Sequence, residues 1–145
     1  MAKQRFKLVI DVHLIVRKGN KILLLKRQNT DYEDGSYHLP AGHMDGNEPV
    51  TEALIRESKE EIGIDINEVD VKLVHIMHSL TNSERMGFFF EAKKWHGEIT
   101  NMEPEKCSAL EWFDLNNLPI PMVPYALYAL SCYKNDQLFS KYGWD

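Results

Sequence analysis

An acidic cluster near the middle of the chain is the part of the sequence best suited to chemistry. Glu57 is followed at spacings of three and four residues by Glu60 and Glu61, so on a helix the carboxylates share one side and repel one another. On a helical wheel of about 100° per residue, Glu57 and Glu61 fall within roughly 20° of Val50, and Glu60 lies beside Ala53. Val50 and Ala53 belong to the apolar stripe of this helix. The acids therefore point where core residues are expected.

Two interpretations of the acidic cluster are open. Solvated glutamates are good helix formers on surface helices, but a solvated face should lie opposite the apolar stripe. Acids in the last turn also oppose the helix dipole. Partly buried carboxylates relieve their repulsion by protonation or by binding a cation. Hard divalent cations take oxygen ligands, so we favour a site for Mg²⁺, for which Mn²⁺ can substitute.

The segment around these acids resembles a known family motif. Residues 42–64, GHMDGNEPVTEALIRESKEEIGI, are similar to the Nudix box, whose pattern is G-x5-E-x7-R-E-U-x-E-E-x-G-U with U a bulky aliphatic residue. The pattern is matched by Gly42, Glu48, Arg56, Glu57, Glu60, Glu61, Gly63 and Ile64. Ser58 stands at a position where an aliphatic residue is usual, so we expect slightly looser packing there and no loss of chemistry. Agreement at so many fixed positions is far more specific than a lone glycine motif.

The resemblance implies metal-dependent hydrolysis of a phosphoanhydride bond in a nucleoside diphosphate linked to a further group X. A MutT-like nucleoside triphosphate pyrophosphatase is the expected form of this activity. By similarity, the metal ligands are Glu57, Glu60, Glu61 and the carbonyl of Gly42. Glu57 is expected to accept the proton from water, with Glu60, Glu61 or a later acid as alternatives. The alternative function is a nucleotide-binding sensor without turnover, although such domains often lack box carboxylates.

Further acidic and basic residues are expected to complete this catalytic site. A guanidinium can grip carboxylates through two parallel hydrogen bonds, so Arg56 is expected to bind Glu48 and fix the box loop against the helix. A phosphate contact is the alternative for Arg56. The resemblance also implies one more acidic metal ligand after the box, either Glu103 or Glu105 in NMEPEKC. An exposed loop acid is an equally good interpretation of both.

The substrate contacts are less strongly marked in the sequence. Arg27 ends the second expected strand and is a candidate for binding a terminal phosphate, as is Arg85 more weakly; solvated strand ends are the alternative. Gly42 and His43 lie in the box loop, where they are expected near phosphate, with loop packing as the alternative for His43. Aromatic side chains that can stack on a base are Tyr37, Phe88, Phe90 and Trp112, although core packing is the favoured interpretation of each. The sequence does not identify X or the base.

The elements that must position these residues alternate between strands and helices. A β-hairpin is expected over residues 7–27, with its turn at 18–20, followed by a loop and a short strand over 37–40. A helix is expected from Pro49 to the C-capping Gly63. Strands over 69–80, 85–95 and 109–115 and a helix over 125–136 complete the pattern. We predict one α+β domain over residues 1–145, with the α/β/α sandwich and mixed sheet of Nudix proteins.

Composition limits the partners of the protein. The formal net charge of -5 argues against polymeric nucleic acid and leaves small nucleotides as the expected partners. The 145 residues contain no apolar stretch long enough for a transmembrane span, so no membrane partner is expected. Cys107 and Cys132 are expected to be buried thiols in a reducing cytoplasm. A homodimer is possible, with Tyr142 and Trp144 as contributors.

Overall fold

A β-hairpin opens the fold. In the computed structural model, which describes residues 3–145, β1 (Val9–Lys18) and β2 (Lys21–Arg27) are joined by a two-residue turn. Arg17 pairs with Ile22, and Lys18 pairs with Lys21. Gly19 has a φ of 61°, a conformation that glycine adopts without steric cost. The predicted hairpin is therefore confirmed.

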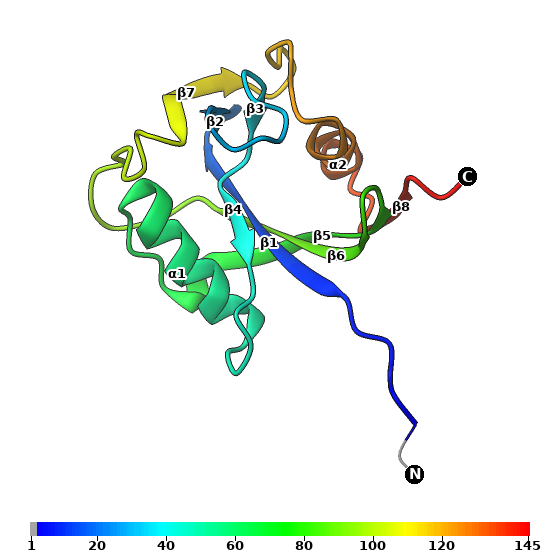
Figure 1. Cartoon of the computed structure of the whole chain (residues 1–145). Coiled ribbons are helices and arrows are strands. Elements are labelled where there is room, and N and C mark those ends of the chain that lie inside the picture. Colours follow the sequence, from blue (N-terminus) through cyan, green and yellow to red (C-terminus); the bar gives the residue numbers. More distant parts are fainter. Residues whose placement is uncertain (1–2) are drawn as a thin grey trace.

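The remaining strands extend the hairpin into a mixed sheet (Figure 1). They are β3 (Tyr37–His38), β4 (Ala41–His43), β5 (Val71–Leu80), β6 (Glu84–Ala92), β7 (Cys107–Asp114) and β8 (Phe139–Tyr142). Their order is β3-β2-β1-β6-β5-β8, with β4 paired to β1 and β7 paired to β2. The β1–β6 and β5–β8 pairs are parallel and the other pairs are antiparallel.

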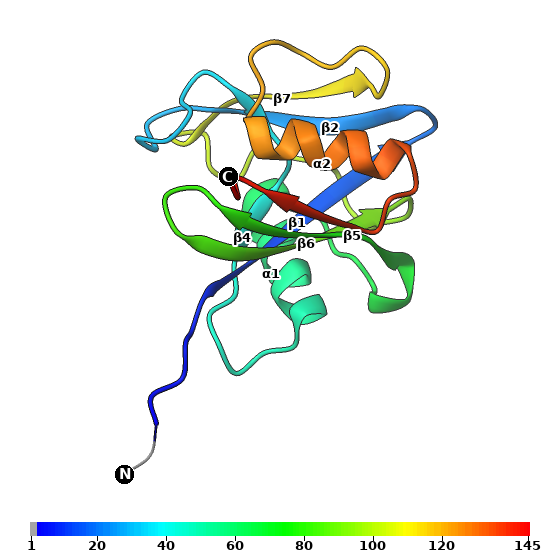
Figure 2. The ribbon, with the colours of Figure 1, turned by 90° about the vertical axis from the view of Figure 1, so that its right-hand side faces the viewer.

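Two α-helices cover opposite faces of the sheet (Figures 1 and 2). They are α1 (Val50–Ile62) and α2 (Pro124–Lys134), and a single 3₁₀ turn, η1 (Glu68–Asp70), precedes β5. Pro49 is the N-cap of α1, one position before the first turn in which it was expected. Gly63 is the C-cap with a φ of 72°, as predicted. Ser58 is buried and donates a hydrogen bond from Oγ to the Leu54 carbonyl oxygen at 2.7 Å.

Each face of the sheet has its own apolar core. Along β1, Val12 and Leu14 belong to the cluster that packs with α1, whereas Ile15 belongs to the cluster that packs with α2. This alternation follows from the period of two in a β-strand. The chain therefore folds as the predicted α/β/α sandwich, an α+β arrangement with helices on both faces of a mixed sheet.

Two short strands were not predicted. Ala41–His43, expected in a loop, forms β4 because it pairs in antiparallel fashion with residues 11–13 of β1. The C-terminal segment forms β8 because Phe139–Tyr142 runs parallel to β5. Strands of three or four residues carry too little periodicity to be recognised alone. Their hydrogen bonds to a neighbouring strand define them.

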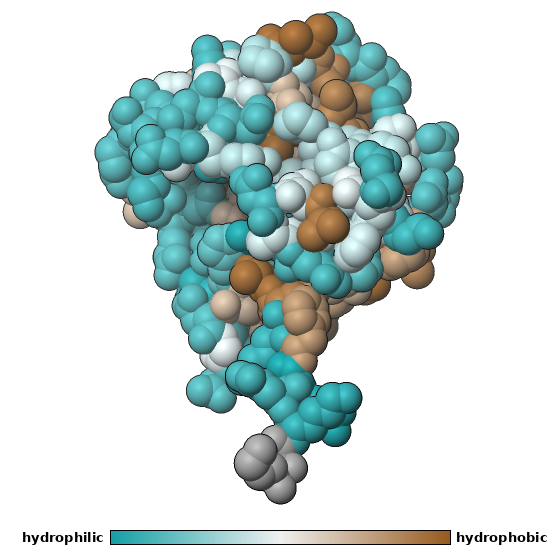
Figure 3. All heavy atoms as spheres, turned by 45° about the vertical axis from the view of Figure 1, so that its right-hand side comes forward, coloured by the Kyte–Doolittle hydropathy of each residue, from teal (hydrophilic) through white to brown (hydrophobic). Residues whose placement is uncertain are grey.

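The face of the molecule in Figure 3 is mainly hydrophilic, with apolar residues gathered in a few separate patches. The most exposed apolar side chain is Ile120, at 95%, which lies in the connection from β7 to α2. Within residues 3–145, no helix is long and apolar enough to cross a membrane. Both cysteines are buried free thiols, as expected.

Candidate active site

The connection from β4 to α1 places a box carboxylate directly against the strand backbone. Glu57 reaches from α1 to β4, where a Cβ atom added to Gly42 would lie only 2.0 Å from the Glu57 Cδ atom. Glycine at position 42 therefore makes room for the carboxylate, which is the role of a strand glycine at a close approach. The Glu57 side chain is 17% exposed. It is thus a largely buried anion seated on residue 42.

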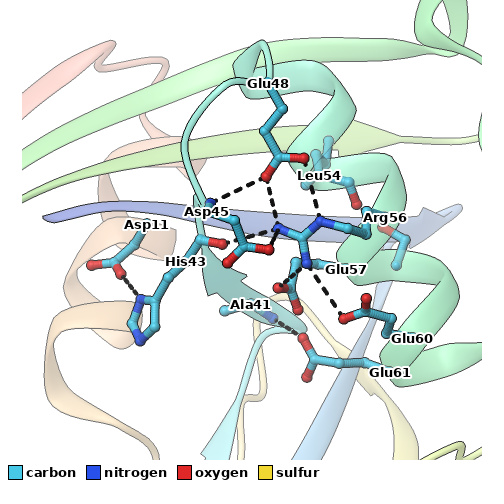
Figure 4. A network of polar contacts seen from close by, with 11 residues as sticks. Asp11, Ala41, His43, Asp45, Glu48, Leu54, Arg56, Glu57, Glu60 and Glu61 are labelled. Atoms are coloured by element: carbon cyan, nitrogen blue, oxygen red, sulfur yellow. Dashed lines mark hydrogen bonds and ion pairs between the residues drawn. The ribbon is translucent and has the colours of Figure 1, made fainter.

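Arg56 is the centre of a network of ion pairs (Figure 4). It holds Glu48 with two hydrogen bonds, from Nη2 to Oε1 at 2.8 Å and from Nε to Oε2 at 3.3 Å. Its Nη1 donates to Glu57 Oε1 at 2.9 Å and to Glu60 Oε2 at 3.4 Å. Its Nη2 also donates to the carbonyl oxygen of His43 at 3.2 Å. These contacts tie the box loop to α1, and the forked Arg56–Glu48 contact expected from the motif is present.

Glu61 contacts the residue before Gly42 in the same strand. Its Oε1 accepts a hydrogen bond from the Ala41 N–H at 2.9 Å. Burial raises the Glu61 pKa well above its ordinary value, and the charges of Glu57 and Glu103 raise it further. Glu105, by contrast, is exposed, and its carbonyl oxygen binds the Asn29 side chain. Of the two candidate acids after the box, Glu103 is therefore the one whose charge acts on the carboxylate cluster.

The residue types at this site fit a hard divalent cation. The Glu57 pKa is raised by burial and by the charges of Glu60 and Asp45, although Arg56 opposes this shift. A cation would relieve the repulsion between Glu57 and Glu61. In the described part of the chain, however, no three acidic, histidine or cysteine side chains are gathered into a metal centre. Glu60 is 53% exposed and bound to Arg56, so it lies at the exposed edge of the apolar stripe rather than within it.

A second polar cluster lies beside the box on β1 and β6. Asp11 Oδ1 and His43 Nδ1 are 2.5 Å apart, and Arg85 Nη1 donates to Asp11 Oδ1 at 3.0 Å. Asp11 is largely buried, whereas the His43 side chain is 64% exposed. Because Asp11 pairs with His43 across the β1–β4 ladder, the two side chains lie on the same face of the sheet. Asp11 thus fixes the position of the His43 ring at the edge of β4.

These groups border a cavity of about 400 Å³ on the α2 side of the sheet. Three box residues, Gly42, His43 and Glu61, reach it, and the sheet, the β2–β3 loop and α2 supply the other walls. Its lining includes Asp11, His13, Arg27, Tyr32, His38, Ala41, Gly42, His43, Glu61, Arg85, Gly87, Phe89 and Tyr125. The cavity is therefore continuous with the box loop and with Glu61.

A buried hydrogen-bonded chain forms part of the cavity wall. Tyr125 Oη lies 2.9 Å from His13 Nε2 and 3.1 Å from His38 Nε2. Since a phenol has one proton, one histidine accepts it and the other donates to the oxygen. Among residues 3–145, the Nδ1 atoms of both histidines find no hydrogen-bond partner. Burial lowers the His13 pKa to about 4 and the His38 pKa well below its ordinary value, so both rings are neutral near pH 7.

The residues predicted to bind substrate divide into two groups. Arg27 and His43 line the cavity, although Arg27 already donates from Nε to the Tyr32 carbonyl oxygen and from Nη2 to Thr30 Oγ1. The proposed stacking residues do not line it. They pack into the two cores, as the favoured interpretation predicts: Phe88, Phe90 and Trp112 with the α1 cluster and Tyr37 with the α2 cluster.

Several cavity residues were missed from the sequence. Asp11 and His13 did carry a signal, because two polar residues that alternate within an apolar strand lie on one face. No pattern in the sequence predicts that Tyr32 and Tyr125 line the cavity. Tyr32 reaches it from a polar loop and Tyr125 from α2. His38 was likewise hidden in a two-residue strand.

Comparison with known proteins agrees with this geometry. Residues 7–130 match the NUDIX domain family. An ADP-ribose pyrophosphatase from Methanocaldococcus jannaschii is 38% identical over 72% of this chain, a match that spans 61% of that protein's length. An 8-oxo-dGTP diphosphatase from Proteus vulgaris is 31% identical over 65% of this chain and 83% of its own length.

A solved structure supports the same assignment. The crystal structure of a MutT NUDIX hydrolase from Burkholderia pseudomallei has a TM-score of 0.79 and 29% identity, and the match covers 87% of this chain and 98% of that one. The box residues, the sandwich fold and the family match, which extends over most of the chain, lead to one assignment. The protein belongs to the Nudix hydrolase family.

Proposed function

We propose that this protein is a metal-dependent nucleotide pyrophosphatase that cleaves a phosphoanhydride bond, with Mg²⁺ as the metal and a nucleoside triphosphate as the substrate. The observation that carries the proposal is the seating of Glu57 on Gly42, which places a largely buried carboxylate at the box backbone. Such a carboxylate is unfavourable unless it serves a cation or a proton. The neighbouring cavity of about 400 Å³ supplies the space for a nucleoside.

Glu57, Glu61 and the Gly42 carbonyl would hold the metal, with Glu60 and Glu103 as further ligands. When bound, a divalent cation neutralises phosphate oxygens and so lowers the repulsion that slows attack on an anhydride. Glu57 accepts a proton from the attacking water. The water oxygen bonds to phosphorus while the bond from phosphorus to the bridging anhydride oxygen breaks. Arg56 holds one Glu57 oxygen and leaves the other free for this proton.

The cavity side of the site binds the rest of the substrate. His43 lines the cavity together with Glu61, is held by Asp11, and is suited to contact the phosphate chain. Arg27 and Arg85 line the same cavity and supply positive charge near it. Triphosphates are favoured over other substrates because the Proteus vulgaris relative is named an 8-oxo-dGTP diphosphatase and the matched structure is named a MutT NUDIX hydrolase. The buried free thiols fit a reducing compartment, which we take to be the cytoplasm.

The test is a screen for nucleoside monophosphate release from nucleoside triphosphates, oxidised purine triphosphates, nucleotide sugars and ADP-ribose, with and without Mg²⁺. Glu57→Gln should lower kcat by about 100-fold or more, because the amide cannot accept the proton. Glu52→Gln is the matched control, since Glu52 lies on the exposed side of the same helix. Equal turnover by the wild type and Glu57→Gln would contradict the role of Glu57. Tight nucleotide binding without turnover of any compound would instead identify a sensor.

A further inference from the structure

The loop between β2 and β3 is built around one side chain that lies at the cavity. Residues 28–36 contain three non-glycine residues with positive φ, namely Asn29 at 54°, Asp31 at 62° and Glu33 at 49°. The last two flank Tyr32 directly. Left-handed conformations in such residues cost energy and persist only where surrounding contacts impose them. The loop is therefore held in a specific shape.

Asp34 imposes much of that shape from within the loop. Its carboxylate accepts hydrogen bonds from the Thr30 N–H at 3.1 Å, the Thr30 hydroxyl at 2.5 Å and the Asp31 N–H at 3.2 Å. Arg27 adds two bonds from the end of β2, to the Tyr32 carbonyl oxygen at 2.8 Å and to Thr30 Oγ1 at 3.0 Å. These contacts leave the Tyr32 backbone little freedom.

The loop is also fastened to the segment that carries Glu103. Gln28 Nε2 donates to the Pro104 carbonyl oxygen at 2.8 Å, and Asn29 Nδ2 donates to the Glu105 carbonyl oxygen at 3.0 Å. The Gln28 N–H binds the Lys106 carbonyl oxygen at 2.9 Å. The loop is thus braced from two sides, and the position of Tyr32 is set relative to the carboxylate cluster.

Tyr32 is 38% exposed and lines the cavity. The Arg27 guanidinium lies 5.3 Å from its centroid, in a cation–π contact. Burial raises the Tyr32 pKa, and the charges of Arg27 and Arg85 oppose this rise. Both arginines line the same cavity as Tyr32, Arg27 from the last residue of β2 and Arg85 from the second residue of β6. The contacts with Arg27 therefore hold an aromatic ring at the cavity.

We propose that Tyr32 is the residue that stacks on the nucleobase of the substrate, with the loop 28–36 as its rigid mount. The inference rests on the proposed function, because it requires a nucleotide ligand. An aromatic face accepts any base, since every base has a π-face. Tyr32 therefore contributes affinity for the nucleoside half of the ligand and none for the phosphates. Asp34 acts through Tyr32 as a positioning residue.

Binding assays with two matched kinds of ligand, one with a nucleoside and one without, test this division. The ligands are the α,β-methylene analogues of the four common nucleoside diphosphates, and methylenediphosphonate, which carries the same diphosphate without a nucleoside. Isothermal titration with Mg²⁺ should show that Tyr32→Leu weakens the tightest-binding analogue by about 10-fold or more. Tyr32→Phe should bind it within about 3-fold of the wild type, because the ring is retained. The affinity for methylenediphosphonate should not change in either variant.

Controls separate stacking from general damage to the fold. Tyr128→Leu removes an exposed tyrosine of α2 that does not line the cavity, and it should leave both affinities unchanged. Asp34→Ala should weaken the nucleotide analogue like Tyr32→Leu, and it should add no further loss in the Tyr32→Leu background. Melting curves show whether each variant is folded.

The possible failures are distinguishable. Three results would overturn the assignment of Tyr32 while leaving the proposed function standing. Tyr32→Leu could weaken the binding of both kinds of ligand equally, or it could leave the affinity for the nucleotide analogue unchanged. Alternatively, Tyr32→Phe could lose as much affinity for that analogue as Tyr32→Leu. If the wild type hydrolyses no nucleotide and binds none of the four analogues, the proposed function fails and the inference fails with it.

Discussion

At the scale of single residues, the candidate site depends on the lack of a side chain at Gly42. The Glu57 carboxylate packs directly against the backbone of Gly42. A Cβ atom added to Gly42 would lie only 2.3 Å from Glu57 Oε2. The added Cβ atom would lie even closer to the Cδ atom of Glu57, at 2.0 Å, so residue 42 or residue 57 would have to move. The contact thus couples the conformation of β4 to the position of the carboxylate that we propose as the catalytic base.

Gly42→Ala should therefore displace Glu57 and lower kcat by about 100-fold, because misplacement by about 1 Å is enough for a loss of that size. The variant should remain folded but melt at a lower temperature, since overpacking costs about 1–3 kcal/mol. In Gly42→Ala/Glu57→Asp, the shorter carboxylate should restore the melting temperature but not the activity. Full activity in Gly42→Ala, measured by release of nucleoside monophosphate, would show that the contact has no catalytic role.

At the scale of elements, the ends of α1 determine how the box is presented. Gly63 ends the helix in the left-handed region, with a φ of 72° and a hydrogen bond from its N–H to the Lys59 carbonyl oxygen at 3.1 Å. The chain then turns so that Ile64 and Ile66 enter the core beneath α1. A residue that resists this conformation would strain the cap and the packing behind it.

Gly63→Ala should lower the free energy of unfolding by about 1–2 kcal/mol, the cost of a left-handed conformation for an L-residue. The nearest neighbour of the added Cβ would be the flexible Met102 side chain, with Sδ at 3.2 Å, and Thr100 Cβ at 3.7 Å would be in ordinary van der Waals contact. The backbone conformation should therefore dominate the loss. Gly63→Asn should cost less, because asparagine tolerates this region. Urea denaturation measures both, and equal losses would show that the cap is not the cause.

At the scale of the whole molecule, stability is linked to pH through buried histidines. The folded protein keeps His13 neutral, with a pKa of about 4 in place of 6.5, because burial disfavours the charged ring. In the unfolded chain, His13 binds a proton as the pH falls below 6.5, its ordinary pKa. In the folded chain, His13 binds a proton only at about pH 4. The unfolded state therefore binds more protons in this window, and stability falls as the pH is lowered.

His13→Gln should remove this pH dependence while keeping a polar group near Tyr125. Between pH 6.5 and pH 4, the wild type should lose roughly 3 kcal/mol more stability than the variant, since one pKa unit corresponds to about 1.4 kcal/mol. The pKa values of Glu57 and Glu61 are raised on folding, so these residues make the protein more stable as the pH falls. Both residues are present in the wild type and in the variant, so their effect cancels in the comparison. Urea denaturation at several pH values gives the comparison, and parallel curves would refute it.

The sequence by itself determined the parts that depend on local pattern. The acids on the apolar stripe, the Arg56–Glu48 pair and the cap at Gly63 follow from helical geometry and the box motif, since all lie within 23 residues of chain. The hairpin and the two helices likewise follow from turn chemistry and periodicity. These features need no knowledge of distant contacts.

Only the tertiary structure decided where the rest of the site lies. β4 exists because β1 supplies its hydrogen bonds, and that pairing brings Asp11 to His43, 32 positions apart in sequence. Tyr125 meets His13 across 112 positions, and Glu103 is brought near Glu61 by the chain beyond β6. Such contacts depend on how strands pair and helices dock, and no local pattern encodes them. The exposure of Glu60 and the placing of Tyr32 at the cavity were settled in the same way.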